Sequence, residues 1–250
     1  MEPLLSIITV CKNEPFIADT CKSVVSQSCR DFEWLVIDGA STDGTLEKIR
    51  PYKDAIDVLV SEPDNGIYEA MNKGIRMARG RYLLFLNGGD CLYDKRTLAQ
   101  VMPHLEKAQA DVFYGDSYRW FPKKADCFIK TYPDELKKDF FLTNTLAHQS
   151  SFIKRDLFAL YGGYREDFKI VSDKEKWLCF MEKGVCFQHL PFPCSRFRMN
   201  GISRQPSAVL RAEKIAMLTA YFPSEVLYNS SQPYLQELFA SQKMMSQKTL

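Results

Sequence analysis

Leu5-Ser6-Ile7-Ile8-Thr9-Val10 is the stretch that decides the fold, because this β-branched apolar run is typical of a strand buried on both faces. An amphipathic helical pattern follows it. Further apolar runs and helical stripes then alternate along the chain, at 32–37, 46–52, 56–60, 67–78 and 82–86. A βαβαβαβ order calls for a parallel sheet with right-handed crossovers and helices on both faces. The sequence therefore predicts an α/β fold with a mostly parallel, Rossmann-like sheet.

Beyond residue 90 the alternation is less regular. We expect the remaining elements to be helices at 97–108, 156–160 and 172–181 and strands at 111–114 and 149–153. Ser172 and Glu175 match the capping-box pattern, in which a cap serine is followed three residues later by glutamate. From residue 196 onward the pattern is helical. We therefore predict one domain over residues 1–195 and a basic helical extension over residues 196–250.

The composition excludes several classes of protein. The 250 residues carry 33 Lys and Arg against 31 Asp and Glu, whereas a dedicated nucleic-acid binder usually has a strong basic excess. The first residues lack the cationic region and the cleavage site of a secretory signal, and no apolar run approaches the ~18 residues that span a bilayer. Eight cysteines without a Cys-x-x-Cys pair favour buried, reduced thiols in a cytoplasmic protein.

The charge is unevenly distributed along the chain. Residues 196–250 contain seven Lys and Arg against three Glu, a net charge of +4, whereas residues 1–195 have a net charge of −2. Apolar side chains are interleaved with the basic ones, as in a basic amphipathic segment that lies on an anionic membrane surface. The alternative is a helix that packs on the domain and leaves its basic face in solvent. The sequence leaves both interpretations open.

Polar side chains follow each of the four expected strands, and three of the four ends carry a carboxylate: Asp38, Asp64 and Asp90. Ligands of open parallel sheets bind at the carboxyl ends of the strands. Clustered acids repel one another, and a bound cation or a ligand would relieve that repulsion. The glycine-rich phosphate-binding loops are absent after the first strand. A diphosphate would instead be held by Mg²⁺ on a carboxylate.

Four motifs in order, at residues 6–10, 36–45, 61–74 and 85–90, resemble family 2 glycosyltransferases. The resemblance is strongest to bacterial enzymes that assemble capsule, O-antigen or colanic-acid-type polysaccharides. It implies a GT-A fold with a nucleotide-sugar-binding half over residues 1–95 and an acceptor half over residues 96–195. The expected activity is that of an inverting, metal-dependent hexosyltransferase. It would move a sugar from a nucleotide-sugar, expected to be a UDP-sugar, to a hydroxyl of a glycan or polyprenyl-linked acceptor in surface polysaccharide biosynthesis.

The resemblance also implies roles for individual residues near the nucleotide-sugar. The base and ribose would be lined by Thr9, Cys11, Asp38 and Gly39, and the nucleotide or diphosphate by Asp64, Asn72 and Lys73. Asp90 matches the usual metal ligand, for Mg²⁺ or Mn²⁺. The motif here is Asn87-Gly88-Gly89-Asp90, which has one carboxylate where many relatives have two or three.

Asp173 matches the base position of the same family. In the first turn of its expected helix, the helix dipole favours the charged carboxylate, which is the form that accepts a proton. One base without a separate carboxylate nucleophile implies a single displacement with inversion. His148, in Ala147-His148-Gln149-Ser150, is expected near the diphosphate or the acceptor.

Two other functions compete with this interpretation. The thinned acidic motif would suit a catalytically inactive sugar-nucleotide-binding or scaffold protein. A nucleotidyltransferase is disfavoured because no glycine-rich triphosphate loop follows the first strand. We expect the protein in the cytoplasm, with peripheral contact to the inner face of the cell membrane through the basic extension.

Overall fold

The computed structural model describes residues 2–120, 127–199, 207–230 and 235. Its strands are β1 (Leu5–Cys11), β2 (Phe32–Asp38), β3 (Val58–Ser61), β4 (Tyr82–Phe85), β5 (Cys91–Leu92), β6 (Val112–Trp120), β7 (Cys127–Lys130), β8 (Ser151–Lys154) and β9 (Phe187–Arg198). Its helices are α1 (Ile17–Val25), α2 (Thr45–Ile49), α3 (Ile67–Met77), α4 (Thr97–Lys107), α5 (Phe140–Thr143), α6 (Asp156–Tyr161), α7 (Ser172–Glu182), α8 (Ala208–Tyr221) and α9 (Ser224–Tyr228), with short 3-10 turns η1 (Arg50–Ala55) and η2 (His148–Ser150).

The strands form one sheet in the order β3-β2-β1-β4-β8-β6-β9-β5, with β7 paired to β6. The N-terminal half, β3-β2-β1-β4, is parallel throughout. β8 then enters antiparallel between β4 and β6, and β6 pairs with β9 in parallel. The predicted α/β fold is confirmed, and the antiparallel pairs lie in the half where the sequence alternation is less regular.

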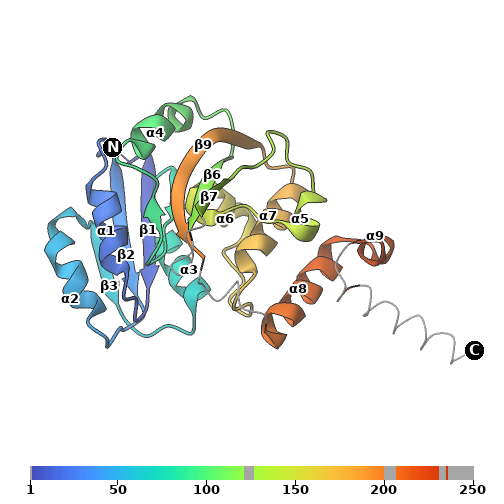
Figure 1. The fold of residues 1–250 in the computed structure, drawn as a ribbon, viewed down its shortest axis with the longest axis horizontal. Coiled ribbons are helices and arrows are strands. Elements are labelled where there is room, and N and C mark those ends of the chain that lie inside the picture. The colour runs from blue at the N-terminus through green and yellow to red at the C-terminus, as the bar shows by residue number, and fades with distance from the viewer. Residues whose placement is uncertain (1, 121–126, 200–206, 231–234, 236–250) are drawn as a thin grey trace, which may run out of the picture.

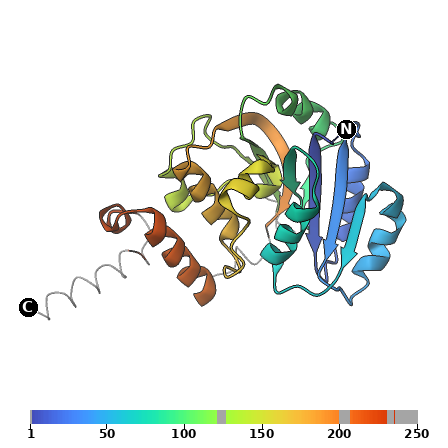
Figure 2. The same cartoon turned by 180° about the vertical axis from the view of Figure 1, so that it is seen from behind.

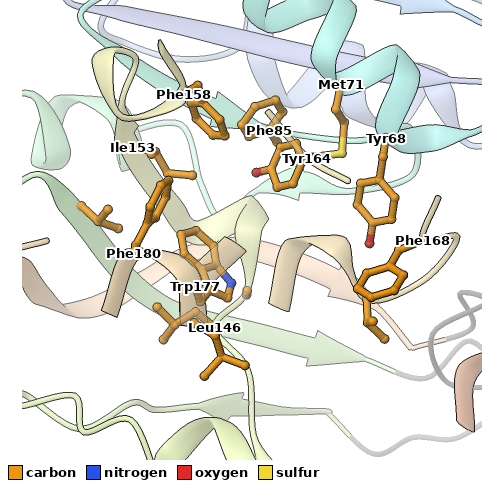
Figure 3. Packing of buried hydrophobic residues seen from close by; sticks show 14 of the residues in the cluster. Tyr68, Met71, Phe85, Leu146, Ile153, Phe158, Tyr164, Phe168, Trp177 and Phe180 are labelled. Atoms are coloured by element: carbon orange, nitrogen blue, oxygen red, sulfur yellow. The ribbon is translucent and has the colours of Figure 1, made fainter. Parts of the chain in front are cut away.

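Helices cover both faces of the sheet (Figures 1 and 2). Alternate residues of β1 point to opposite sides: Ile7 joins the core beneath α1 and α4, and Ile8 joins the core beneath α3 and α7. On the second face the rings of Phe85, Phe158 and Tyr164 pack together, with centroids 5.2–5.9 Å apart (Figure 3). All seven residues of β1 are buried, as a strand covered on both faces requires.

Helix α3 lies unusually close to the sheet, and Gly74 permits it. A Cβ atom at this position would lie 2.4 Å from Cγ2 of Ile8. Real Cβ contacts are not that short, so any larger residue would push α3 away from β1. The close approach matters for the site, because the N-terminus of α3 borders the carboxyl ends of β1 and β4.

The described helices near the C-terminus, α8 and α9, pack on the domain. β9 runs through the expected division at residue 195 and pairs with β6 and β5 inside the sheet, so the helical part begins only at α8. Met217 and Leu218 of α8 are fully buried and belong to the same core as Trp177 of α7. Figures 1 and 2 both show α8 beside α7. The division of the chain into domains stays a prediction.

The capping box expected at the start of α7 is wrong. Val171 takes the cap position, Ser172 is the first residue of the helix, and no side chain of the cap residue bonds to the helix. The hydroxyl of Ser172 is buried and has no hydrogen-bond partner among the residues that the structure describes. Glu175 instead accepts a hydrogen bond from the hydroxyl of Tyr221 on α8. A tertiary contact has replaced the local one.

All eight cysteines are free thiols. Four are buried, as expected, but Cys127 and Cys186 are exposed. In the part of the chain that the structure describes, no helix has the length and apolar character needed to cross a bilayer.

Candidate active site

A cavity of about 580 Å³ opens at the carboxyl ends of β1 and β4. Its walls come from the segment after β1, the Asn87–Asp90 turn after β4, the N-terminus of α3, the start of α7 and the end of β9. Five of the residues expected at a site line it: Cys11, Asp64, Asp90, His148 and Asp173. These residues are up to 162 positions apart in the sequence, and the fold brings them to one place, where an open α/β sheet binds its ligands.

Asp90 forms the acidic wall of the cavity. It is 7% exposed, and its backbone amide donates to the carbonyl of Asn87 at 2.9 Å, which closes the turn after β4. Burial raises the pKa of the Asp90 carboxyl to about 7; His148 opposes this rise and Glu14 adds to it. A buried carboxylate that is costly to ionise alone is suited to hold a cation or to face a donor of a ligand.

His148 links Asp90's turn to Asp173. Its Nδ1 atom lies 3.2 Å from Oδ2 of Asp173, and its Nε2 atom lies 3.1 Å from the side-chain nitrogen of Asn87. The other carboxylate oxygen of Asp173 lies 3.2 Å from the hydroxyl of Tyr68 on α3. Asp173 sits in the first turn of α7, as predicted. The chain of contacts fixes both oxygens of the candidate base.

The pKa of His148 is raised above its ordinary value of 6.5. Burial alone would lower it, but the hydrogen bond that His148 donates to Asp173 and the negative charges of Asp173 and Asp90 together outweigh burial. The two carboxylates therefore make protonation of this imidazole easier than in a free histidine. A positive group here can face the negative charge that develops on a departing phosphate.

Asp64 forms the opposite end of the cavity. Lys12 Nζ lies 3.7 Å from Oδ1 of Asp64, and the amide of Gly66 donates to the same oxygen at 3.1 Å. Gly39 lies directly behind this carboxylate, since a Cβ atom there would be 2.3 Å from Oδ2 of Asp64. Because Gly39 has no side chain, the Asp64 carboxylate can occupy its position at the cavity wall.

Four other expected residues do not line the cavity. Thr9 is fully buried in β1 and accepts a hydrogen bond from the indole of Trp34. Asp38 is also fully buried, and it holds the turn after β2 by accepting from Ser41 and Ser61.

The remaining two are on α3. Asn72 bonds the 164–166 loop through both ends of its amide, and Lys73 pairs with Glu62 at 2.6 Å. These contacts within the protein are enough to account for an asparagine at position 72 and a lysine at position 73. Any contact of theirs with a nucleotide stays a prediction.

The structure adds residues to the cavity that the sequence patterns did not single out. Glu14, Tyr68, Lys169 and Arg198 all line it. The guanidinium of Arg198 lies between the rings of Phe16 and Trp120, with its carbon 3.5 Å and 4.5 Å from their centroids. Arg198 ends β9, far from every motif. Glu14 lies three residues after the end of β1. Its place in the polar segment after the first strand was the only sequence signal that could have marked it as a cavity residue.

The cavity offers some, but not all, of the ligands that a divalent cation needs. Among the described residues, no three His, Cys, Asp or Glu side chains form a ready metal site. The Oδ1 atom of Asn87 is buried, however, and has no hydrogen-bond partner within the described part of the chain. Together with Asp90 it offers two oxygen atoms of the kind that Mg²⁺ and Mn²⁺ prefer. These residues fit a cation whose coordination is completed by substrate phosphates and water.

Comparisons with known proteins agree with this geometry. The sequence model of the family described as Glycosyl transferase family 2 matches residues 6–162. A PGL/p-HBAD biosynthesis glycosyltransferase of Mycobacterium tuberculosis is 32% identical over 182 residues, which cover 68% of this chain and 67% of the relative. The putative teichuronic acid biosynthesis glycosyltransferase TuaG of Bacillus subtilis is 33% identical over 150 residues, which cover 58% of this chain and 59% of the relative.

Solved structures show the same fold. TarS 1-349 of S. aureus in complex with UDP-GlcNAc superposes with a TM-score of 0.71 at 16% identity, over 91% of this chain and 67% of that one. The mannosyltransferase PcManGT of Pyrobaculum calidifontis, in complex with GDP-Man and Mn²⁺, gives 0.61 at 18% identity, over 98% of this chain and 81% of that one. The GT-A fold predicted from the sequence is confirmed.

Proposed function

The chain belongs to glycosyl transferase family 2, and from this premise we propose that it transfers a sugar from a nucleotide-sugar to a hydroxyl group of a cell-surface glycan or lipid-linked glycan, with inversion at the anomeric carbon. One observation carries the proposal. Asp90 and Asp173 line the same cavity, and His148 interacts with both. An acid that can hold the diphosphate's cation and a base for the acceptor are the two groups that such a transfer needs.

The chemistry follows from these positions. The acceptor hydroxyl enters on the side of Asp173, whose carboxylate takes its proton. The acceptor oxygen forms a bond to the anomeric carbon while the bond from that carbon to the diphosphate oxygen breaks. The nucleoside diphosphate leaves with the electron pair. A single displacement of this kind inverts the anomeric centre.

The groups around the leaving diphosphate balance its negative charge. Asp90 and the free oxygen of Asn87 would hold a Mg²⁺ or Mn²⁺ ion, which neutralises charge on the departing phosphates. His148, with its raised pKa, adds a positive group beside them. Arg198 and Lys169 contribute further positive charge to the walls of the same cavity. The low exposure of Asp90 strengthens each of these interactions.

We propose a UDP-sugar as the donor. TarS is bound to UDP-GlcNAc and PcManGT to GDP-Man, so the fold accepts more than one base. In this chain the end of the cavity at Asp64 and Lys12 offers one acceptor and one donor group, which is the pairing that the edge of a uracil requires. The contacts expected from Thr9, Asp38, Asn72 and Lys73 remain part of this proposal.

We also propose that the protein works in the cytoplasm with peripheral contact to the membrane. Val209 on α8 and Val226 and Tyr228 on α9 are exposed apolar side chains in the basic extension. Co-sedimentation with vesicles in which about one third of the lipid is anionic tests this contact. Binding should weaken in Val226→Ser/Tyr228→Ser, and equal binding of both proteins would contradict it.

The proposed function is tested by thermal shift with UDP-, GDP- and dTDP-sugars, each with Mg²⁺, with Mn²⁺ and without a cation. We expect one nucleotide class, the uridine class, to raise the melting temperature in a cation-dependent way. The same donor should be slowly hydrolysed without an acceptor. Asp90→Ala should abolish both effects, whereas Glu106→Ala, at an exposed position on α4, should keep them. A shift without hydrolysis would support the inactive scaffold instead.

A further inference from the structure

Helix α8 reaches the candidate base through one buried carboxylate. Glu213 on α8 is 8% exposed and accepts hydrogen bonds from the backbone amides of three successive residues: Lys169 at 2.5 Å, Ile170 at 2.9 Å and Val171 at 3.2 Å. Helix α7 begins at the next residue, and Asp173 is its second. A residue 42 to 44 positions further along the chain thus binds the segment that leads into α7.

No local group does this work. The cap residue Val171 has no side chain able to accept a hydrogen bond, and the hydroxyl of Ser172 is buried without a partner among the described residues. Amides that lose their acceptor where water cannot replace it destabilise the conformation they belong to. The segment 169–171 therefore depends on Glu213 for its conformation.

The same segment reaches the cavity from its other side. The carbonyl of Ile170 accepts from the hydroxyl of Tyr68 at 2.8 Å, and that hydroxyl also lies 3.2 Å from Oδ1 of Asp173. Figure 3 shows Tyr68 with its hydroxyl turned toward the part of the core where Phe168 lies, just ahead of this segment. Glu213, Ile170, Tyr68 and Asp173 are therefore consecutive links of one hydrogen-bonded chain.

The position of the Ile170 carbonyl matters because the Tyr68 hydroxyl has only one hydrogen. While Asp173 is charged, Tyr68 donates to its carboxylate. Once Asp173 has taken a proton, the new acid can donate to the oxygen of Tyr68, whose own hydrogen then turns to the Ile170 carbonyl. The chain of hydrogen bonds stays complete in both states only if Ile170 is held where Glu213 holds it.

We propose that Glu213 is a positioning residue for the transfer reaction: by binding the amides of 169–171 it sets the place of Asp173 and keeps the carbonyl of Ile170 against Tyr68. This inference rests on the proposed function of Asp173 as the base. It gives the helical extension a role in turnover, since a residue outside the sheet and outside the cavity determines the geometry of the base.

The test compares two variants of the full-length chain that each remove one side-chain contact between α8 and the α7 region. Glu213→Gln keeps the shape but replaces one accepting oxygen with an NH₂ group that faces amide donors. Tyr221→Phe removes the hydrogen bond to Glu175 and leaves the amides of 169–171 bound. The measurements are donor hydrolysis with its kcat and KM, melting temperature, and hydrogen exchange of the amides of 169–171.

Glu213→Gln should lower kcat by about 10- to 100-fold, because a displacement of about 1 Å at a reacting group costs up to that much. The fall in kcat should exceed any rise in KM for the donor, which Lys169 at the cavity wall would cause, and the three amides should exchange faster. Tyr221→Phe should lose a similar amount of thermal stability and keep kcat and the slow exchange. Equal kcat values in Glu213→Gln and wild type would overturn the inference. If the proposed function itself were wrong, the result would differ: the wild-type protein would hydrolyse no donor.

Discussion

The Nδ1 atom of His148 lies 3.2 Å from the Oδ2 atom of Asp173 in the candidate active site. The histidine comes from η2 and the aspartate from the first turn of α7, so the contact joins two elements that are separate in the sequence. An imidazole that donates from Nδ1 holds the carboxylate in one orientation and stabilises its charged form. In the proposed reaction, the pair would connect the acceptor's base to the groups around the leaving diphosphate, because His148 also interacts with Asp90.

Asp173→Asn should remove the base and keep the shape of the cavity. The amide cannot take a proton from the acceptor, so kcat should fall by about 10²–10⁴-fold, the usual contribution of a positioned general base. Donor binding, measured by calorimetry with the nucleotide-sugar and a cation, should remain at the wild-type value. A variant that binds the donor and still turns it over at the wild-type rate would exclude Asp173 as the base.

His148→Gln should change how stability depends on pH. The pKa of His148 is raised in the folded protein above its ordinary value of 6.5, chiefly by Asp173, so this pairing stabilises the fold fully below that value and is lost as the pH rises through the folded pKa. The wild type should exceed the variant in unfolding free energy most at about pH 5.5–6, and the gap should shrink toward about pH 8. Urea denaturation across this range measures it, and a gap that widens with pH would contradict the assignment.

Gly39→Ala should weaken donor binding. The added methyl group would lie 2.3 Å from Oδ2 of Asp64 and 3.0 Å from the Lys12 side chain, so both groups must move at one end of the cavity. We expect a roughly tenfold weaker affinity for the nucleotide-sugar, equivalent to about 1.4 kcal/mol. Gly115→Ala is the matched control, because its methyl group would lie 2.3 Å from Sγ of Cys194, which neither lines this cavity nor belongs to the expected nucleotide contacts. The control should lose stability and keep affinity.

The first ninety residues show how much a sequence can reveal about this fold. β1 and β2 are continuous apolar runs, because strands of a parallel sheet covered on both faces leave no polar side to alternate. The second half of the sheet was harder to predict. β9 contains two prolines and exposed residues and is shifted in register near Gly115 and Asp116 of β6, so no simple period marks it.

The site divides in a similar way. Asp64, Asp90 and Asp173 could be found because each follows a strand or opens a helix in a recognisable motif. Thr9 and Asn72 are in the same motifs, but their side chains bond Trp34 and the 164–166 loop and do not line the cavity. Their contact with a nucleotide stays a prediction. The role of Glu213 could not be predicted, because its partners are backbone amides that carry no sequence signal.

The failed capping box has the same physical origin. Ser172 and Glu175 have the right spacing, but both ends of the pattern face tertiary contacts with α8 instead: Glu213 binds the amides just ahead of the helix, and Tyr221 donates to Glu175. Local patterns predict caps well only where no distant side chain offers a better-placed acceptor. Such an acceptor becomes available here because α8 packs on the same core as α7.

Lys174→Met should stabilise the protein at neutral pH. Lys174 follows the candidate base and is 8% exposed; burial, with a further contribution from Lys214, lowers its pKa to about 8, and Asp173 acts in the opposite direction. The folded-state pKa is below the ordinary value of 10.5, so the cost of holding the protonated amine in the fold is full below about pH 8 and fades as the pH rises toward 10.5.

Methionine has a similar length and no charge to bury. We expect the variant to be more stable than the wild type by about 1–3 kcal/mol at neutral pH, with the gap closing by about pH 10. Urea denaturation at both pH values measures it. Lys176→Met is the control: Lys176 is equally buried but donates to the carbonyls of Tyr161 and Gly162, so its loss should destabilise at both pH values. If Lys174→Met instead destabilised the protein at both pH values, the protonated amine of Lys174 would be stabilised by the fold, which would contradict its lowered pKa.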